Sequence, residues 1–144
     1  MFWMKKEARE EVEDLTVPER VAAEAERLYR HERMHCAEAV LASVKRQFAP
    51  EIPDQVLAAA LAFGGGSGAG CICGAVSGGT MALGLVLNDK KAASALTRDL
   101  HEWFTKEYGA TCCKILTAHG KKGCLALTAR VAGKVAEMLV AKGR

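Results

Sequence analysis

The side chains best suited to chemistry in this sequence are its six cysteines. A thiolate binds soft metals and iron–sulfur clusters, and it also forms and exchanges disulfides. Several of these cysteines fall at expected helix starts, where the positive end of the helix dipole lowers the pKa of a thiol. Because metal ligands and redox thiols both need a lowered pKa, the sequence predicts one functional site built from cysteines. The six are Cys36, Cys71, Cys73, Cys112, Cys113 and Cys124.

The spacing of the cysteines matches none of the common local motifs. The sequence has no Cys-x-x-Cys pair, which argues against a thioredoxin-type site, a zinc ribbon and covalent haem attachment. Cys71-Ile72-Cys73 is a Cys-x-Cys pair of little specificity, and a disulfide between the adjacent Cys112 and Cys113 would be strained. Segments that are far apart in the chain must therefore bring the thiols together.

Helices are the elements that the composition predicts for positioning the cysteines. Half of the residues are hydrophobic and only 6% are aromatic, and runs of the residues that favour strands are nearly absent. A chain of 144 residues fits one domain and can bury a core without disulfides. We expect an all-α fold, a single-domain compact bundle of about six helices with a glycine-rich loop over residues 1–144. Residues 1–16 would form a loosely attached N-terminal helix.

Capping residues and apolar periodicity predict where the helices begin and end. Thr16 followed by Pro18 and Glu19 forms a capping-box start, and Gly109 is a helix-ending glycine. Cys36 and Cys124 each stand at an expected helix start. The predicted helices cover about residues 5–15, 16–31, 36–48, 53–63, 73–87, 89–108 and 124–141, with a further short segment over residues 112–118.

Glycines interrupt the most apolar part of the chain. Residues 64–70 form a glycine-rich loop, and four more glycines lie within the helix expected over residues 73–87. Each glycine costs a helix about 1 kcal/mol relative to alanine, so the pattern indicates close packing of another backbone or a cofactor. Gly74 and Gly78 are the candidates for such supporting backbone. A phosphate-binding loop is disfavoured because no Gly-Lys-Ser/Thr sequence follows.

Charge and hydropathy disfavour nucleic-acid binding and membrane insertion. The net charge is +3, and basic residues alternate with acidic ones, unlike the basic patch of a nucleic-acid-binding protein. The uncharged residues 56–87 are split by the glycine loop, so neither flank reaches the roughly 20 apolar residues that span a bilayer. No secretory signal is recognisable at the N-terminus. We expect a cytoplasmic protein, in which cysteines more often bind metals or catalyse than form structural disulfides.

The sequence around the cysteines resembles the redox-active protein family C_GCAxxG_C_C. Cys73-Gly74-Ala75-Val76-Ser77-Gly78 reads as the Cys-Gly-Ala-x-x-Gly motif of that family, and Phe63-Gly64-Gly65-Gly66 precedes it as in the family. The resemblance covers about residues 20 to 140. Its other parts are Cys36-Ala37-Glu38-Ala39-Val40, the segment 108–116 and Cys124.

The resemblance implies which thiols form the site. The four characteristic cysteines of the family carry over onto Cys36, Cys73, Cys113 and Cys124, and these are the candidate metal ligands. Cys113 is preferred to Cys112 because the Lys-Ile-Leu that follows it resembles the family's Cys-Arg-Glu-Leu. Cys71 and Cys112 are then additional thiols, or substitutes for their neighbours. The family is similar to the non-haem part of split-Soret cytochromes, which implies a [2Fe-2S] or [4Fe-4S] cluster and a homodimer.

Three functions are consistent with these residues. The first is electron transfer to a redox partner protein through an iron–sulfur cluster held by the four cysteines. The second is a thiol–disulfide redox enzyme or sensor without metal, and the third is a zinc or other soft-metal site. A helical interaction module with incidental cysteines is the remaining alternative. The sequence shows no further catalytic residues, and it leaves open whether the protein is an enzyme.

Overall fold

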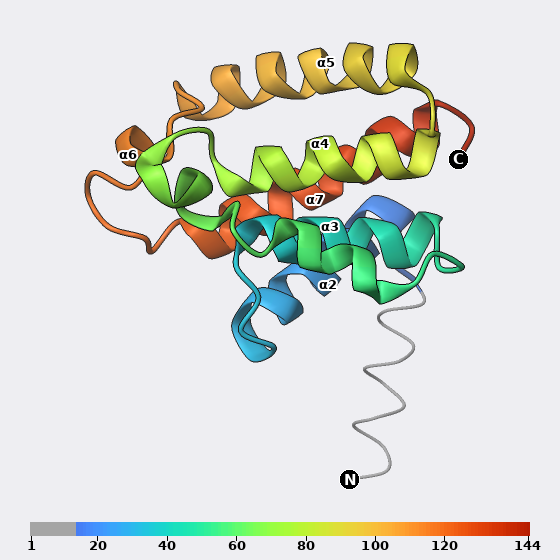
Figure 1. Cartoon of the computed structure of the whole chain (residues 1–144), viewed down its shortest axis with the longest axis horizontal. Helices are drawn as coiled ribbons and strands as arrows, with labels where there is room; N and C mark the ends of the chain where they lie inside the picture. Colours follow the sequence, from blue (N-terminus) through green and yellow to red (C-terminus); the bar gives the residue numbers. More distant parts are fainter. Residues whose placement is uncertain (1–13) are drawn as a thin grey trace, which may run out of the picture.

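The computed structural model describes residues 14–144 and is all-α. Five longer helices pack together, and two short helical turns precede α4 in the chain (Figure 1). The helix predicted over residues 5–15 falls almost entirely outside the described residues. The elements are α2 (Val17–His31), α3 (Cys36–Phe48), η1 (Asp54–Ala60), η2 (Gly66–Gly70), α4 (Gly74–Leu87), α5 (Lys90–Tyr108), α6 (Cys113–Leu116) and α7 (Cys124–Ala141).

The predicted start of α2 is confirmed in its atomic detail. The Thr16 side chain accepts a hydrogen bond from the backbone N–H of Glu19 at 3.3 Å, and the Glu19 carboxylate accepts one from the backbone N–H of Thr16 at 3.4 Å. This reciprocal pair satisfies two backbone donors that the first turn leaves free. Val21, Ala25 and Leu28 lie on the buried face of α2, which packs mainly against α7.

Helix α4 passes through the middle of the molecule with α3, α5 and α7 around it. A side chain at Gly78 would collide with the backbone carbonyl oxygen of Ala37 in α3, and its Cβ would lie 2.9 Å from the Ala37 Cα. The backbones of α3 and α4 therefore touch, which only glycine permits here. This contact fixes Cys36, the first residue of α3, relative to the start of α4.

The segment predicted as a helix over residues 53–63 is wound more tightly than an α-helix. It forms the 3-10 helix η1, and its continuation is a turn in which the N–H of Phe63 bonds to the carbonyl of Ala60 at 3.1 Å. The glycine loop then makes one wide helical turn, η2, with left-handed backbone at Gly65, Gly66 and Gly68. The sequence predicted a loop here, and the left-handed residues explain why no α-helix forms.

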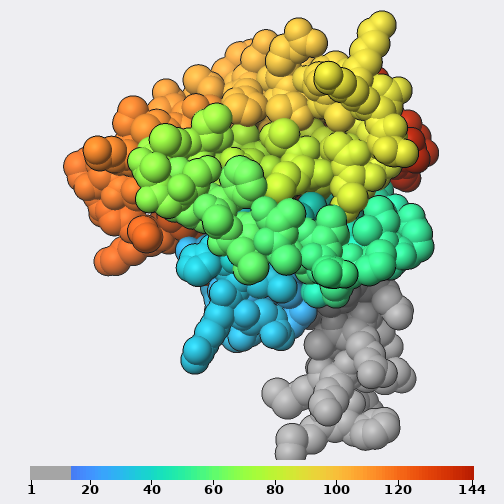
Figure 2. All heavy atoms as spheres, viewed as in Figure 1, coloured from blue at the N-terminus to red at the C-terminus, as the bar shows by residue number. Residues whose placement is uncertain are grey.

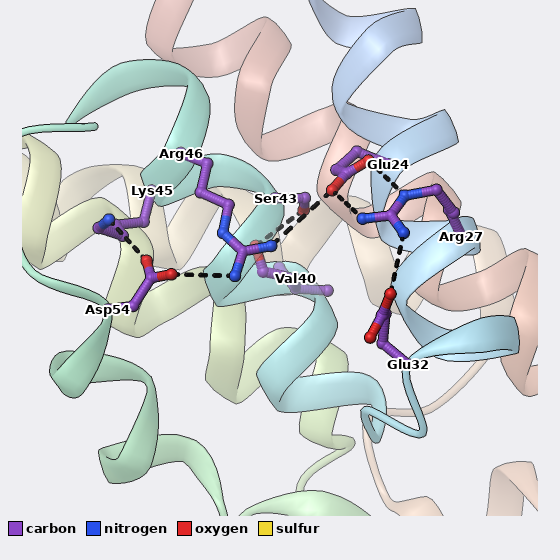
Figure 3. Close-up of polar contacts among 8 residues, drawn as sticks. All are labelled: Glu24, Arg27, Glu32, Val40, Ser43, Lys45, Arg46 and Asp54. Carbon is purple, nitrogen blue, oxygen red and sulfur yellow. Dashed lines mark hydrogen bonds and ion pairs between the residues drawn. The ribbon is translucent and has the colours of Figure 1, made fainter.

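A chain of ion pairs ties η1 to α3, and α3 in turn to α2 (Figure 3). Asp54 accepts hydrogen bonds from Lys45 at 2.9 Å and Arg46 at 3.1 Å, and Arg46 also lies 3.9 Å from Glu24 of α2. Glu24 pairs with Arg27 at 2.8 Å. The hydrogen bonds from Lys45 and then Arg46 lower the pKa of the Asp54 carboxyl. The network holds the segment that leads into the glycine loop.

Candidate functional site

Four helices begin at the same end of the molecule, and each begins with a cysteine. Cys36 is the first residue of α3, Cys73 is the N-cap of α4, Cys113 opens α6 and Cys124 opens α7. In Figure 1 these starts gather at the left, beside the glycine loop. All four side chains line a single cavity of about 390 Å³. The structure thus brings together the four cysteines that the sequence singled out.

A short antiparallel bridge joins two of the cysteine segments. Ile72 pairs with Cys112, the N–H of Cys73 donates to the carbonyl of Thr111 at 2.7 Å, and the N–H of Cys113 donates to that of Cys71 at 2.6 Å. These bonds hold Cys73 and Cys113 on the same cavity although forty residues separate them. The bridge has no helical periodicity, and no local pattern in the sequence indicates it.

Glycines make room for the thiols on one side of the cavity. A Cβ on Gly74 would collide with the Sγ of Cys36 and lie 2.9 Å from the carbonyl oxygen of Phe63. A Cβ on Gly66 would lie 2.8 Å from the Cβ of Cys113. Gly74 therefore lies against the Cys36 thiol, whereas Gly78 lies in the contact between α3 and α4.

The extra cysteines lie outside the cavity wall. Cys71 is exposed, and its Sγ is 3.9 Å from the carbonyl oxygen of Ala69. Cys112 is half-buried, and its thiol donates a hydrogen bond to the carbonyl of Gly70 at 3.1 Å. The side chain of Cys112 is thus held by the glycine loop, while that of its neighbour Cys113 lines the cavity.

The pKa values of three site thiols are raised, against the expectation from their helix-start positions. Burial raises the pKa of Cys73 to about 12, and the charges of Cys36 and Cys113 add to this rise. The backbone N–H groups of Ala75 and Val76 oppose it. Burial likewise raises the pKa of Cys36 and Cys124. The helix N-termini do favour the thiolates, but loss of water and like-charge repulsion outweigh them in the metal-free protein.

The remaining wall contains hydroxyl groups that the sequence reasoning missed. Tyr29, Tyr108 and Thr128 line the cavity beside the thiols. Burial raises the pKa of Tyr29, and the charges of Cys124 and Cys36 raise it further. Thr128 could have been found from sequence, because it lies four residues after Cys124 in a predicted helix and so shares its face. Tyr29 lies in α2, and its sequence distance from the cysteines gives no such signal.

The cysteines differ from a compact single-ion site and share one cavity. Across residues 14–144, no three or more His, Cys, Asp or Glu side chains lie close enough together to hold a single ion. The four thiols instead surround a cavity, and four cysteine thiolates are the usual ligand set of [2Fe-2S] and [4Fe-4S] clusters. The residues present therefore fit such a cluster in number and chemistry.

Comparison with known proteins gave one match. The profile of the family described as "Putative redox-active protein (C_GCAxxG_C_C)" matches residues 34–138, a range that contains all six cysteines. Searches of curated proteins and of solved structures found no match. Within the part of the chain that the structure describes, no helix combines the length and the apolar character needed to cross a membrane.

Proposed function

Because this chain belongs to the redox-active protein family C_GCAxxG_C_C, we propose that it is an electron-transfer protein with an iron–sulfur cluster. The ligands in this proposal are Cys36, Cys73, Cys113 and Cys124. The observation that carries it is the meeting of four thiols, from four separate helix starts, on one cavity of about 390 Å³. When bound, such a cluster supplies reversible electron transfer.

The chain's own groups would stabilise and shield the charge at the site. Backbone N–H groups of Gly65 and Ala37 face the Cys36 thiol, and those of Ala75 and Val76 face Cys73. Hydrogen bonds of this kind disperse the negative charge of thiolates and tune a reduction potential. Because burial keeps the free thiols protonated, cluster binding releases protons to solvent.

The two other sequence hypotheses receive less support. A thiol–disulfide enzyme needs a thiolate near neutral pH, yet the pKa values of Cys36, Cys73 and Cys124 are raised. A zinc site needs ligands that meet at one ion, whereas the thiols of the described chain are spread around a cavity.

The cavity rim favours an acidic redox partner. The segment from Gly109 to Ala129 contains no acidic residue, and Lys121, which lines the cavity, is exposed together with Lys114 and Lys122. Ile115 is 63% exposed on the same rim. Figure 2 shows the orange residues of this segment on the surface beside the green glycine loop. A docked partner would thus exchange electrons near the cysteines, and we place this exchange in the cytoplasm.

The proposal is tested on protein purified without oxygen. We expect a coloured protein with broad absorption between about 400 and 500 nm and about two or four irons per chain, matched by labile sulfide. A colourless protein with one zinc per chain would show a zinc site instead. A colourless, metal-free protein that gains a disulfide on mild oxidation would favour the thiol–disulfide alternative.

A further inference from the structure

Thr128 is a buried residue with an unused hydroxyl on the cavity wall. Its side chain lies within α7 and is 0% exposed. Its Oγ1 makes no hydrogen bond to any residue that the structure describes. A buried hydroxyl without a partner costs about 1–3 kcal/mol, so such a group calls for an explanation. The cavity that holds the four cysteines is the space this side chain borders.

Two other threonines show the bond that Thr128 does not make. The Oγ1 of Thr80 donates to the carbonyl of Val76 at 2.9 Å, and that of Thr117 donates to the carbonyl of Cys113 at 2.7 Å. Both are bonds to the residue four positions earlier, the usual partner for a helical threonine. For Thr128 that residue is Cys124, and the corresponding bond is absent. The hydroxyl is therefore available to a group in the cavity.

The position of Thr128 indicates which group it would reach. Residues four apart on a helix lie about 5–6 Å apart at their Cβ atoms, so Thr128 is the neighbour of Cys124 on one face of α7. Helical side chains also lean toward the N-terminus, which here is the end that carries Cys124 and the cavity. A sulfur atom held at this place is within the reach of the hydroxyl.

We propose that the Thr128 hydroxyl donates a hydrogen bond to a sulfur atom of the bound cluster or its Cys124 ligand, and thereby raises the reduction potential. This inference rests on the proposed iron–sulfur site. A hydrogen bond to sulfur stabilises the reduced state more than the oxidised state, because the reduced state carries more negative charge. Thr128 would thus be a positioning and tuning residue that completes its hydrogen bonding only when the site is filled.

The test compares two substitutions at this site with one elsewhere. Thr128→Val keeps the shape and removes the hydroxyl, Thr128→Ser keeps the hydroxyl, and Thr80→Val removes a hydroxyl bonded to its own helix. Each full-length variant is measured metal-free by thermal unfolding and, after anaerobic cluster loading, by redox titration. We expect Thr128→Val to raise the melting temperature of the metal-free protein by a few degrees, because it removes an unsatisfied buried group.

In the loaded protein we expect Thr128→Val to shift the midpoint potential to a more negative value at unchanged iron content. Thr128→Ser and Thr80→Val should keep the wild-type potential. An unchanged potential in fully loaded Thr128→Val would overturn the inference and leave the iron–sulfur proposal standing, as would a lower melting temperature of its metal-free form. A wild-type protein that takes up no iron would overturn both, and the iron assay separates the two cases.

Discussion

Cys73 and Cys71 are two residues apart, yet their thiols differ in exposure and in their place relative to the cavity. Cys73 is buried at the start of α4, and burial raises its pKa to about 12. Cys71 is exposed and lies outside the cavity. Loss of water therefore outweighs the helix dipole that the sequence pattern invokes. In the folded, metal-free protein, Cys73 binds its proton more tightly than in the unfolded chain. Its contribution to stability is thus present below about pH 9 and is lost as the pH rises toward about 12.

Alkylation should separate these two thiols. In reduced, metal-free protein at pH 8, the thiolate fraction of Cys73 is about one in ten thousand, which follows from its pKa of about 12. We expect iodoacetamide to modify Cys71 first. The rate at Cys73 should rise by about a hundredfold between pH 8 and pH 10 and keep rising beyond. Peptide mass spectrometry over time measures both rates, and a Cys73 rate that levels off near neutral pH would contradict the burial effect.

At the scale of elements, glycines set how closely α3 and α4 approach. Gly78 faces the backbone of Ala37, whereas Gly84 in the same helix has nothing within 4 Å of its added Cβ. The two positions form a matched pair, because alanine is the better helix former at both. They differ in their surroundings: Gly78 is buried against the backbone of α3, whereas Gly84 is exposed.

Alanine substitutions at the two positions should therefore change the free energy of unfolding in opposite directions. We expect Gly78→Ala to lower the free energy of unfolding by about 1–3 kcal/mol, since two backbones must separate. Gly84→Ala should raise it by about 0.5–1 kcal/mol through helix propensity alone. Urea unfolding of the two variants provides the comparison. Equal effects of both substitutions would refute the close contact.

The sequence predicts the helices well and the connections between them poorly. The bounds of α3 and α7 agree with the apolar periodicity, and the Thr16 capping box is present as expected. The π-type turn η2 and the bridge between Ile72 and Cys112 depend on contacts between distant segments, which local patterns do not encode. For the same reason, local patterns do not decide between Cys112 and Cys113, of which Cys113 lines the cavity and Cys112 bonds to the glycine loop.

At the scale of the whole molecule, the approach of charged partners depends more on where the charges lie than on the net charge of +3. Lys121 and Lys122 lie on the cysteine end, while Lys90 and Lys91 begin α5 at the opposite end of the bundle (Figure 1). A local positive field accelerates the approach of anions and is weakened by salt.

The homodimer implied by the family resemblance is a separate prediction, checked by measuring the mass of the loaded protein in solution.

Electron transfer to small acceptors should report this field. In the reduced, loaded protein, we expect the double substitution Lys121→Glu and Lys122→Glu to slow oxidation by anionic ferricyanide by on the order of tenfold at low ionic strength. The same variant should speed oxidation by a cationic cobalt complex. Lys90→Glu with Lys91→Glu is the control and should change neither rate appreciably. Stopped-flow kinetics that show no difference between the two pairs would count against a basic docking rim.

The most direct test of the proposed site uses two adjacent cysteines. Cys113 lines the cavity, whereas Cys112 bonds to the carbonyl of Gly70 away from it. Each is replaced by serine in the full chain, and iron and labile sulfide are counted after anaerobic cluster loading. We predict that Cys112→Ser keeps the wild-type content and that Cys113→Ser loses most of it. Full iron in Cys113→Ser, or equal loss in both variants, would contradict a cluster held by Cys36, Cys73, Cys113 and Cys124.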